Sequence, residues 1–422
     1  MKHSRRIVRG IAPLAVVLLL SMSFGTGCSS RMAPTIAPVP LISVAHPVDW
    51  WFVFKFNAAN FPGCKAKASR SCRFGGQAQQ YSSFGQQFVY ASSENPALQN
   101  GGDNCLEDTT TDPVGATFDQ IYNGDFNYVV WNDQFYDDPV IEGCTTYCDT
   151  PWGHSKGMLT WDADGNGLVL QVTTPSWPAS GNKLFPRTTD GNTLGCVKDN
   201  NVQVSQHFFA LRLTRQDVIK VLAALRNASV VTDPANSQVV RNRGSIEIQE
   251  LVSLLGKQST SRAYTDVMLS TGIRLISKPS DLQVPPWQMV SSILGGHALR
   301  TATWWTSPAI DSTSASTPIG CWDTSLKKPG AVEIATTGKW NEKTLGLQGG
   351  LGSDFNHAKI GVSISGTDSI FGDMNQQGTL SGPQCGISQN GRGGLFYVLE
   401  DQVLHDSIAH LISGATAPVA AQ

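Results

Sequence analysis

The stretch that decides the fold is residues 151–158, PWGHSKGM, which places His154 and Lys156 two positions apart between two glycines. On an extended segment, residues i and i+2 point to the same face, so an imidazole and an ammonium can meet one ligand here. Taken alone, the pair also fits the polar edge of a strand. Gly153 and Gly157 would let a charged ligand approach the backbone closely.

The same pattern returns in residues 354–363, DFNHAKIGVS, where His357 and Lys359 precede an apolar, strand-like run. One His-x-Lys would be weak evidence for chemistry. Two of them in corresponding settings predict one paired site at the interface of two half-chains. We therefore divide the chain into an N-terminal half, 47–212, and a C-terminal half, 213–422, each of which contributes one pair.

A site with two imidazoles and two ammonium groups suits the hydrolysis of a phosphodiester. Two lysines can neutralise the nonbridging oxygens, and the leaving oxygen needs a proton. One neutral imidazole can attack phosphorus while a second, protonated imidazole donates to the leaving group. This chemistry requires no metal ion or other cofactor, and the sequence shows no carboxylate cluster of the two-metal type.

The order of expected strands and helices predicts a mixed α/β fold. Helices are expected at 215–226, where Thr214 can cap the first turn, at 245–255, and around 403–411. The segment 162–167, DADGNG, predicts a hairpin turn, and the region 62–111 predicts mostly loop. Strands are expected at 48–56, 126–131, 157–161, 168–173, 206–213, 265–277, 298–305, 359–364 and 394–399.

The N-terminus has the three parts of an export signal: basic residues up to Arg9, an apolar run over 11–20, and small residues before Cys28. We assign 1–27 to a signal peptide and 28–46 to a lipid anchor and tether. Thr26-Gly27-Cys28 resembles the end of a lipobox, although Gly25 stands where a branched aliphatic residue is usual. A lipid on Cys28 would be the contact with the membrane, and the protein is expected in the periplasm, on the outer membrane or outside the cell.

The nine cysteines leave an even number once Cys28 is set aside, which indicates disulfides in an exported protein. Zinc bound by Cys144 and Cys148 near His154 is the weaker alternative, because no second ligand cluster has suitable spacing. The net charge of −2 becomes more negative without the basic leader, which excludes a constitutively basic nucleic-acid coat. A polyanion site must therefore be local, or become positive as histidines charge at acid pH.

Five segments together resemble the deoxyribonuclease II family. They are VDWWFVFKF (48–56), GHSKG (153–157), NHAKIGVS (356–363), GDMN (372–375) and RGG (392–394), and they occur in the family's order. The resemblance implies a phospholipase D-like fold with a pseudo-two-fold arrangement. In that fold each half is a mixed β-sheet flanked by helices, and the active site lies at the interface of the halves.

The resemblance also implies a metal-independent endonuclease that acts on DNA and is favoured at acid pH. Such an enzyme forms a phosphohistidine intermediate and leaves 3′-phosphate and 5′-hydroxyl ends. A homodimer is compatible with the family. Four residues match the catalytic positions, His154, Lys156, His357 and Lys359, and three would bind phosphate or support them, Asn375, Asp373 and Ser155.

The second motif departs from the family pattern at three positions. Ala358 replaces a serine, Ile360 replaces a tryptophan, and Asn356 stands where aspartate is frequent. These changes bear on the orientation and pKa of His357 without removing its imidazole.

Other functions fit the same residues. One is a phospholipase or another phosphodiesterase of the same superfamily, and another is a surface lipoprotein that binds polyanions with inactive histidines. Among the other candidate side chains, His207 and His297 are expected to be structural or to face DNA. His405 and His410 are expected on the solvated face of the last helix, and Trp304-Trp305 in the core rather than stacked on bases.

Overall fold

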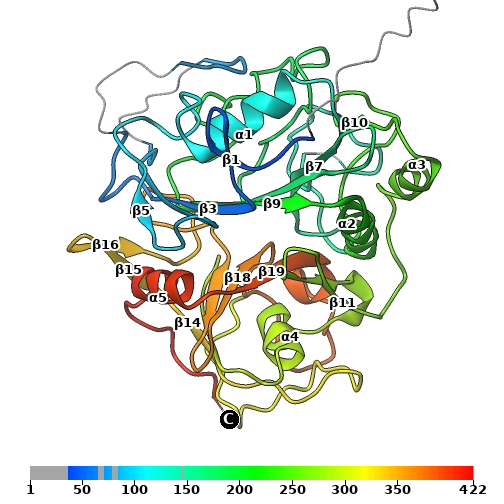
Figure 1. The fold of residues 1–422 in the computed structure, drawn as a ribbon. Helices are drawn as coiled ribbons and strands as arrows, with labels where there is room; N and C mark the ends of the chain where they lie inside the picture. Colours follow the sequence, from blue (N-terminus) through cyan, green and yellow to red (C-terminus); the bar gives the residue numbers. More distant parts are fainter. Residues whose placement is uncertain (1–36, 65–70, 78–83, 145, 422) are drawn as a thin grey trace, which may run out of the picture. The chain divides into compact units, whose positions relative to one another are not determined.

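The computed structural model describes residues 37–64, 71–77, 84–144 and 146–421. The expected leader, Cys28 and the first part of the tether lie outside these residues. The fold is mixed α and β, built around an eight-stranded and a seven-stranded sheet (Figure 1). No helix in the described part is long and apolar enough to cross a membrane.

The eight-stranded sheet comes almost entirely from the first half of the chain. Its order is β10 (Val240–Arg241), β6 (Asn127–Asn132), β7 (Lys156–Trp161), β8 (Gly167–Val172), β9 (Gln206–Leu213), β3 (Trp50–Lys55), β4 (Phe88–Ser92) and β5 (Gln99–Asn100). The neighbouring pairs in this sheet are antiparallel.

The seven-stranded sheet comes from the second half. Its order is β11 (Thr265–Met268), β12 (Arg274–Lys278), β19 (Gly394–Glu400), β18 (Asp368–Gly372), β17 (Ile360–Ser363), β13 (Leu299–Ala302) and β14 (Val332–Ile334). Two small hairpins pair β1 (Leu41–Ser43) with β2 (His46–Pro47) and β15 (Thr337–Trp340) with β16 (Lys343–Gly346).

The two sheets repeat one strand order. Read from β6 to β3, five strands of the first sheet correspond in order to β13, β17, β18, β19 and β12 of the second, so that β7 matches β17 and β3 matches β12. The outer strands differ, because β10 pairs antiparallel with β6 whereas β14 pairs parallel with β13. The helices repeat as well: α1 (Pro113–Tyr122) precedes β6 as α4 (Pro286–Ile293) precedes β13, and α2 (Arg215–Asn227) follows β9 as α5 (Gln402–Leu411) follows β19. The remaining helix, α3 (Ile246–Ser253), follows β10.

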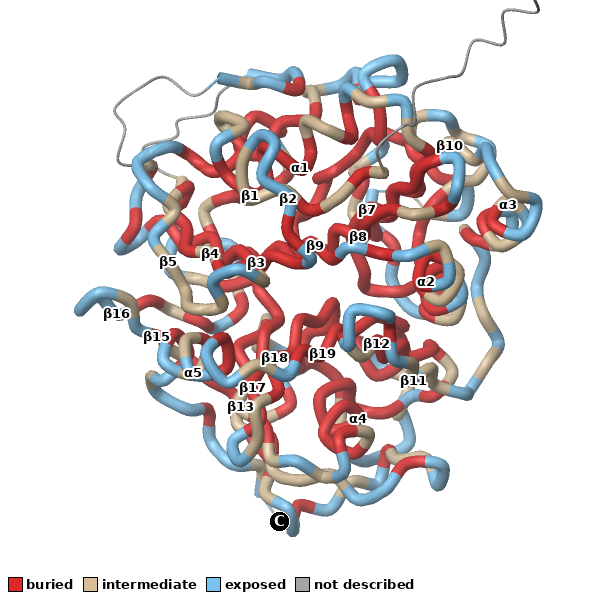
Figure 2. The backbone as a smooth tube through the Cα atoms, viewed as in Figure 1, coloured by how far each residue is buried: buried red, intermediate tan, exposed pale blue. Residues whose placement is uncertain are grey.

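The environment of strand β3 explains why apolar and polar residues do not alternate along it. Every residue in it is buried, and neighbouring side chains point to opposite faces of a sheet. On one face Trp51 donates its indole N–H to Thr117 of α1, and on the other Phe52 stacks on Phe371 of β18 at 4.7 Å. Both faces of the strand are therefore covered, one by a helix and one by the other sheet (Figure 2).

Several expected elements are present with small shifts at their ends. Helix α2 is capped by Thr214, whose hydroxyl and the Asp217 carboxylate exchange hydrogen bonds with the backbone of the first turn. The segment 162–167 is the turn between β7 and β8. The pairing of eight cysteines is also confirmed, as Cys64–Cys105, Cys72–Cys196, Cys144–Cys148 and Cys321–Cys385, and the zinc alternative at Cys144 and Cys148 is wrong.

Other expectations are corrected. The strand expected at 265–277 is a hairpin of β11 and β12, in which Gly272 supplies a positive φ of 81° at the turn. The expectation of a solvated His405 is wrong, because this histidine is buried and its Nε2 lies 2.7 Å from the Ser363 carbonyl oxygen.

The segment 37–46, which we expected to belong to a tether, lies against α1. The Leu41 N–H donates to the Thr117 hydroxyl, and the Thr117 hydroxyl donates to the Leu41 carbonyl. Val39 makes a similar pair of hydrogen bonds with the Gln120 side chain. A tether, as proposed, would therefore end before Val39.

Candidate active site

Both His-x-Lys motifs reach one cavity of about 250 Å³ between the strand ends of the two sheets. The motifs supply His154, His357 and Lys359 to its wall, and the loop after β18 supplies Asn375. The rest of the lining is Asp133, Gln134, Tyr147, Asp149, Thr173, Trp304, Gln377, Ser388, Gln389 and Arg392. Four of the seven predicted site residues therefore share one wall, and Lys156, Ser155 and Asp373 lie behind it.

His154 is held from both sides by the second half of the chain. Its backbone N–H donates to the Gly393 carbonyl at 2.8 Å, and its ring Nδ1 lies 2.8 Å from the Asp373 carbonyl oxygen. Because a carbonyl oxygen only accepts, Nδ1 must carry the proton in this contact. The neutral ring then keeps its lone pair on Nε2.

His357 is held by the first half in the corresponding way. Its backbone N–H donates to the Ser205 carbonyl at 2.8 Å, and Ser205 precedes β9 as Gly393 precedes β19. The Trp304 ring meets the imidazole edge-on, with 4.3 Å between the ring centroids. The His357 Nε2 is buried and has no hydrogen-bond partner among the described residues, so it is available to a ligand.

Lys156 belongs to a buried ion-pair network. Its Nζ lies 2.5 Å from Asp133 Oδ1, and the other oxygen of Asp133 accepts from Arg392 at 2.8 Å. Burial opposes ionisation of Asp133, but the charges of Lys156 and Arg392 outweigh it and hold the pKa of that carboxyl well below its usual range. Asp133 is therefore an anion that compensates the buried cations.

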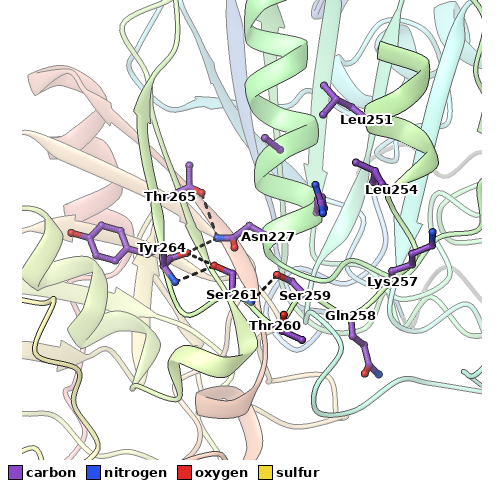
Figure 3. A pocket seen from close by; sticks show the side chains of 13 residues that line it. Asn227, Leu251, Leu254, Lys257, Gln258, Ser259, Thr260, Ser261, Tyr264 and Thr265 are labelled. Carbon is purple, nitrogen blue, oxygen red and sulfur yellow. Dashed lines mark hydrogen bonds between the residues drawn. The ribbon is translucent and has the colours of Figure 1, made fainter. Parts of the chain in front are cut away.

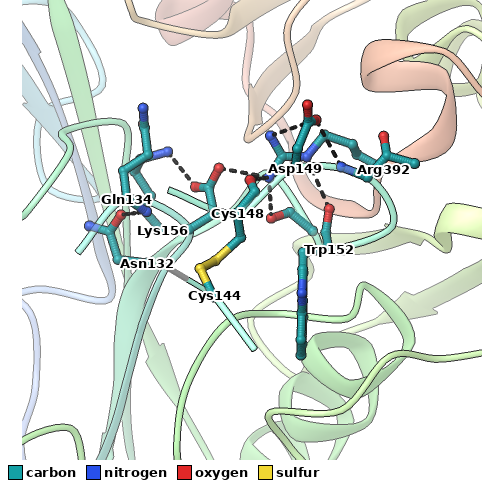
Figure 4. Close-up of a disulfide and its surroundings, with 11 residues drawn as sticks. Asn132, Gln134, Cys144, Cys148, Asp149, Trp152, Lys156 and Arg392 are labelled. Atoms are coloured by element: carbon teal, nitrogen blue, oxygen red, sulfur yellow. Dashed lines mark hydrogen bonds and ion pairs between the residues drawn. A yellow bond between two sulfur atoms is a disulfide. The ribbon is translucent and has the colours of Figure 1, made fainter. Parts of the chain in front are cut away.

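Arg392 also fixes the loop that precedes His154. Its guanidinium donates to the carbonyl groups of Trp152, Cys148 and Gly153 at 2.7–3.0 Å. Figure 4 shows this arginine reaching the loop that the Cys144–Cys148 disulfide closes. These hydrogen bonds anchor Cys148, Trp152 and Gly153, and Gly153 leads directly into the first motif.

Lys359 has a different environment from Lys156. Its Nζ donates to the His357 carbonyl at 2.6 Å, and in the described part of the chain it forms no ion pair within 4.0 Å. Burial, followed by the charge of Lys156, holds the pKa of Lys359 well below its usual range. An anion in the cavity would supply the charge that this ammonium lacks.

The register explains this difference between the lysines. In the first sheet, Asn132 at the end of β6 pairs with Lys156, and Asp133 is the next residue. In the second sheet, Ala302 at the end of β13 pairs with Ile360, so continuing the antiparallel register places Thr303 opposite Lys359. The residue that corresponds to Asp133 is therefore the one after Thr303. That residue is Trp304. The second half thus has an indole against its histidine where the first half has a carboxylate beside its lysine.

Asp373 and Ser155 join the halves behind the histidines. The Asp373 carboxyl accepts from the Gln171 side chain and from the Leu395 N–H, both at 3.0 Å, and it also hydrogen bonds to Ser155. Burial raises the pKa of Asp373 to about 7 against these hydrogen bonds. Ser155 accepts in turn from the Trp131 indole at 2.8 Å.

Asn375 presents an amide to the cavity. Its Nδ2 donates to Gln377 at 2.9 Å, and its Oδ1 is buried without a partner among the described residues. Together with the His357 Nε2, this gives the cavity two polar atoms that are ready to bind a ligand.

The pKa values of both motif histidines are lowered, which favours the neutral imidazole. Burial and the adjacent Lys156 hold the pKa of His154 well below its ordinary value. Burial and the adjacent Lys359 do the same to the pKa of His357. An anion bound between the lysines would oppose this effect and favour the protonated form.

The glycines of the first motif do not open the backbone to a ligand, contrary to our expectation. A Cβ on Gly153 would overlap the Ala228 carbonyl at the end of α2, and one on Gly157 would overlap the Leu170 carbonyl and the Trp131 ring. These glycines serve the packing of the chain against itself.

Sequence reasoning missed Asp133 as a partner of the first motif. The only local signal of Asp133 in the sequence is its place directly after a strand. That place does not indicate that Asp133 contacts Lys156 in space. His207 is fully buried, and its Nδ1 accepts from the Lys359 backbone N–H, which supports its structural reading.

A larger cavity of about 640 Å³ lies between α2, α3 and residues 257–265 (Figure 3). None of the predicted site residues lines it. Within the described ranges, no group of three or more His, Cys, Asp or Glu side chains is placed to hold a metal ion.

The chain was compared with models of protein families. The model described as deoxyribonuclease II matches residues 43–417, which is most of the chain. The chain belongs to the deoxyribonuclease II family. No curated protein matched the chain.

Membership in the deoxyribonuclease II family identifies the chain as a hydrolase that cuts the phosphodiester bonds of DNA. The family match includes both segments that carry the His-x-Lys motifs, each of which leads into a strand, and the loop that carries Asn375. The four disulfides indicate an oxidising or extracellular compartment for this deoxyribonuclease.

Proposed function

We propose that this deoxyribonuclease II cleaves DNA without a metal ion, through a phosphohistidine formed between two pseudo-symmetric, phospholipase D-like halves. The observation that carries the proposal is that His154 and His357, from different sheets, line one cavity together with Lys359 and Asn375. The repeated strand order supports descent of the two sheets from one ancestral unit, in which α2 belongs to the first repeat because it follows β9 as α5 follows β19.

In the first step, the Nε2 lone pair of His154 attacks phosphorus and forms a P–N bond. The P–O5′ bond breaks, and its electron pair goes to the 5′ oxygen, which takes a proton from protonated His357. We assign the nucleophile to His154 because the Asp373 carbonyl holds its proton on Nδ1. The products of this step are a free 5′-hydroxyl and a 3′-phosphoryl group on His154.

In the second step, neutral His357 takes a proton from water, whose oxygen attacks phosphorus. The P–N bond breaks and returns its electron pair to His154, which leaves a 3′-phosphate. Lys359, in the cavity wall, stabilises the negative charge on the nonbridging oxygens in both steps, and Lys156 adds its charge from behind the wall. The second N–H of Asn375 Nδ2 donates to a phosphate oxygen, while the Asp373 carbonyl orients the His154 ring and the Asp373 carboxyl hydrogen bonds to the adjacent Ser155.

The acid preference follows from the state of the histidines. Step one needs His357 protonated, whereas burial and Lys359 hold its pKa well below the ordinary value. Lowering the pH raises the fraction of His357 that carries a proton, until His154 is also protonated and loses its lone pair. The cleavage rate is therefore highest at acid pH and has a bell-shaped pH profile. Its two apparent pKa values describe the coupled titration of His154 and His357 together.

The disulfides and the basic, apolar N-terminus favour action outside the cytoplasm. A signal peptide at 1–27 and a lipid on Cys28 would place the enzyme at a membrane surface. Mass spectrometry of the protein from a membrane fraction would detect the lipid on Cys28.

Plasmid cleavage in excess EDTA across pH tests the mechanism. We expect wild type to cleave with an acid optimum and His154→Ala and His357→Ala to lose at least about 100-fold in rate. His410→Ala, in which an exposed histidine of α5 is removed, is the matched control and should cleave like wild type. A requirement for added magnesium, or full activity in either active-site variant, would refute the two-histidine mechanism.

A further inference from the structure

Two buried lysines outside the His-x-Lys motifs occupy corresponding places in the two sheets. Lys55 ends β3 and pairs with Gln206 of β9, and Lys278 ends β12 and pairs with Gly394 of β19. Both side chains are fully buried. Since β3 corresponds to β12 and β9 to β19, the register makes the two lysines equivalent.

The Lys55 ammonium holds the turn that enters β9. Its Nζ donates to the carbonyls of Val202 at 2.7 Å and Val204 at 2.6 Å. It also contacts the carbonyls of Phe56 at 3.0 Å and Gly85 at 2.7 Å. One ammonium therefore ties the end of β3 to the residues on either side of position 203.

The Lys278 ammonium holds the turn that enters β19 in the same pattern. Its Nζ donates to the carbonyls of Asn390 at 2.7 Å and Arg392 at 2.9 Å, and to that of Pro279 at 3.3 Å. Lys55 pairs with Gln206, and Lys278 pairs with Gly394. Val204 precedes Gln206 by the same number of residues as Arg392 precedes Gly394, and Val202 and Asn390 match in the same way. Three carbonyl contacts therefore match between the two lysines, and Lys55 adds the Gly85 carbonyl.

The next residue in each turn fixes an active-site histidine. Ser205, which follows Val204, accepts from the His357 N–H at 2.8 Å. Gly393, which follows Arg392, accepts from the His154 N–H at 2.8 Å. Each buried lysine is therefore one peptide unit away from the carbonyl that positions the histidine of the opposite motif.

We infer that Lys55 and Lys278 are paired positioning residues, Lys55 for His357 and Lys278 for His154, an inference that rests on the proposed two-histidine function. Burying an ammonium is costly, whereas a methionine of similar length would fill the space without that cost. What a methionine lacks is the set of N–H donors that hold the carbonyls in their turns. The lysines thus keep the two histidine backbones at a fixed separation across the interface.

The test compares Lys55→Met and Lys278→Met in the full chain, with Lys55→Gln and Lys278→Gln as conservative variants that keep two N–H donors. Lys339→Met, which changes an exposed lysine of β15, is the control. The first readout is the NMR signals of the histidine rings, assigned with His154→Ala and His357→Ala. The second readout is kcat and KM for a short DNA duplex.

We expect Lys278→Met to shift or broaden the His154 signals and leave those of His357 in place, and Lys55→Met to do the reverse. In both, kcat should fall about 10- to 100-fold with KM within about twofold, because the reacting groups are displaced while DNA still binds. The Gln variants should recover part of the loss. If the Met variants do not fold, the Gln variants carry the same comparison.

Equal disturbance of both histidines by each variant would overturn the inference, since general loosening predicts that result. Unchanged signals with kcat within twofold would also overturn it. The NMR readout does not depend on turnover. It therefore separates failure of this inference from failure of the two-histidine mechanism, which the alanine variants report.

Discussion

At the scale of single residues, Asp133 shows how one carboxylate controls the charge of the site. It is almost completely buried and binds both Lys156 and Arg392. Removing one member of a buried ion pair leaves the others as uncompensated charges, which is far more costly than the net value of the pair.

We therefore predict that Asp133→Asn lowers the free energy of unfolding by about 3–5 kcal/mol, measured by urea denaturation. The matched control is Asp125→Asn, which changes an exposed carboxylate that pairs with Arg241 and Arg243. Exposed pairs contribute about 0–1 kcal/mol, so the control should stay close to wild type. Equal losses in the two variants would contradict the buried network.

Asp373 makes the stability depend on pH. Burial raises its pKa to about 7 in the folded protein, above the unfolded value of about 4. A carboxyl with a raised folded pKa contributes stability that is fully present below the unfolded pKa and is lost as the pH rises through the folded pKa. Between pH 4 and 7 this group therefore makes wild type less stable as the pH increases.

Asp373→Asn removes this titrating carboxyl, so the free energy of unfolding should depend less on pH in the variant than in wild type. We predict that the difference in unfolding free energy between variant and wild type changes by about 1.4 kcal/mol per pH unit between pH 5 and 7, in favour of the variant at pH 7. Urea denaturation of both proteins at several pH values measures it. Parallel curves for the two proteins would show that Asp373 ionises normally.

The residue scale also marks the limit of what the sequence can predict. His154, Lys156, His357 and Lys359 were predicted from a repeated local pattern, because i and i+2 on a strand share a face. Asp133 and the Asp373 carbonyl enter the site through contacts between distant segments, and no spacing along the chain encodes those distances. The prediction that Gly153 opens the backbone to a ligand was wrong for the same reason. Gly153 packs against Ala228, which is distant in the sequence.

At the scale of elements, continuous apolar runs such as β3 were predictable, and so was the capped helix α2. Helices α1 and α4 were not predicted, although each begins with a proline, a residue common at the first helical position. The hairpin of β11 and β12 was merged into one strand because only Gly272 marks its turn.

Helix α2 connects this scale to the active site. The Ala228 carbonyl at its C-terminal end lies against Gly153, which precedes His154, and against Gly393, whose carbonyl binds the His154 N–H. A Cβ on either glycine would overlap that carbonyl oxygen. The C-terminal end of α2 therefore restricts the backbone positions of Gly153 and Gly393, which together set the position of His154.

We predict that Gly393→Ala reduces kcat for DNA cleavage by about 100-fold, because a displaced carbonyl moves the His154 backbone. Gly352→Ala is the control, since the new Cβ there would meet only the Phe355 side chain, at 3.2 Å. Steady-state kinetics on a short duplex measures the effect. Wild-type kcat in Gly393→Ala would show that α2 does not constrain the site.

At the scale of the whole described fold, the two sheets pack against each other through one shared hydrophobic cluster, and a second, smaller cluster lies within the second half. Phe371 of β18 stacks on Phe52 of β3 at 4.7 Å and on Phe209 of β9 at 4.5 Å. The largest buried cluster includes residues of both sheets and of α2 and α5. The sequence indicated two halves from the duplicated motif, but which side chains join them depends on how the sheets pack.

A shared core predicts that the halves unfold together. Calorimetry of wild type should show one transition, and Phe371→Ala should lower the unfolding free energy by about 3–5 kcal/mol while keeping a single transition. Ile364→Ala, which truncates a half-exposed side chain in the turn between β17 and β18, is the control and should stay within about 0.5 kcal/mol of wild type. Two separate transitions in wild type would mean that each sheet is stable alone, and the histidines would then depend on docking of two independent domains.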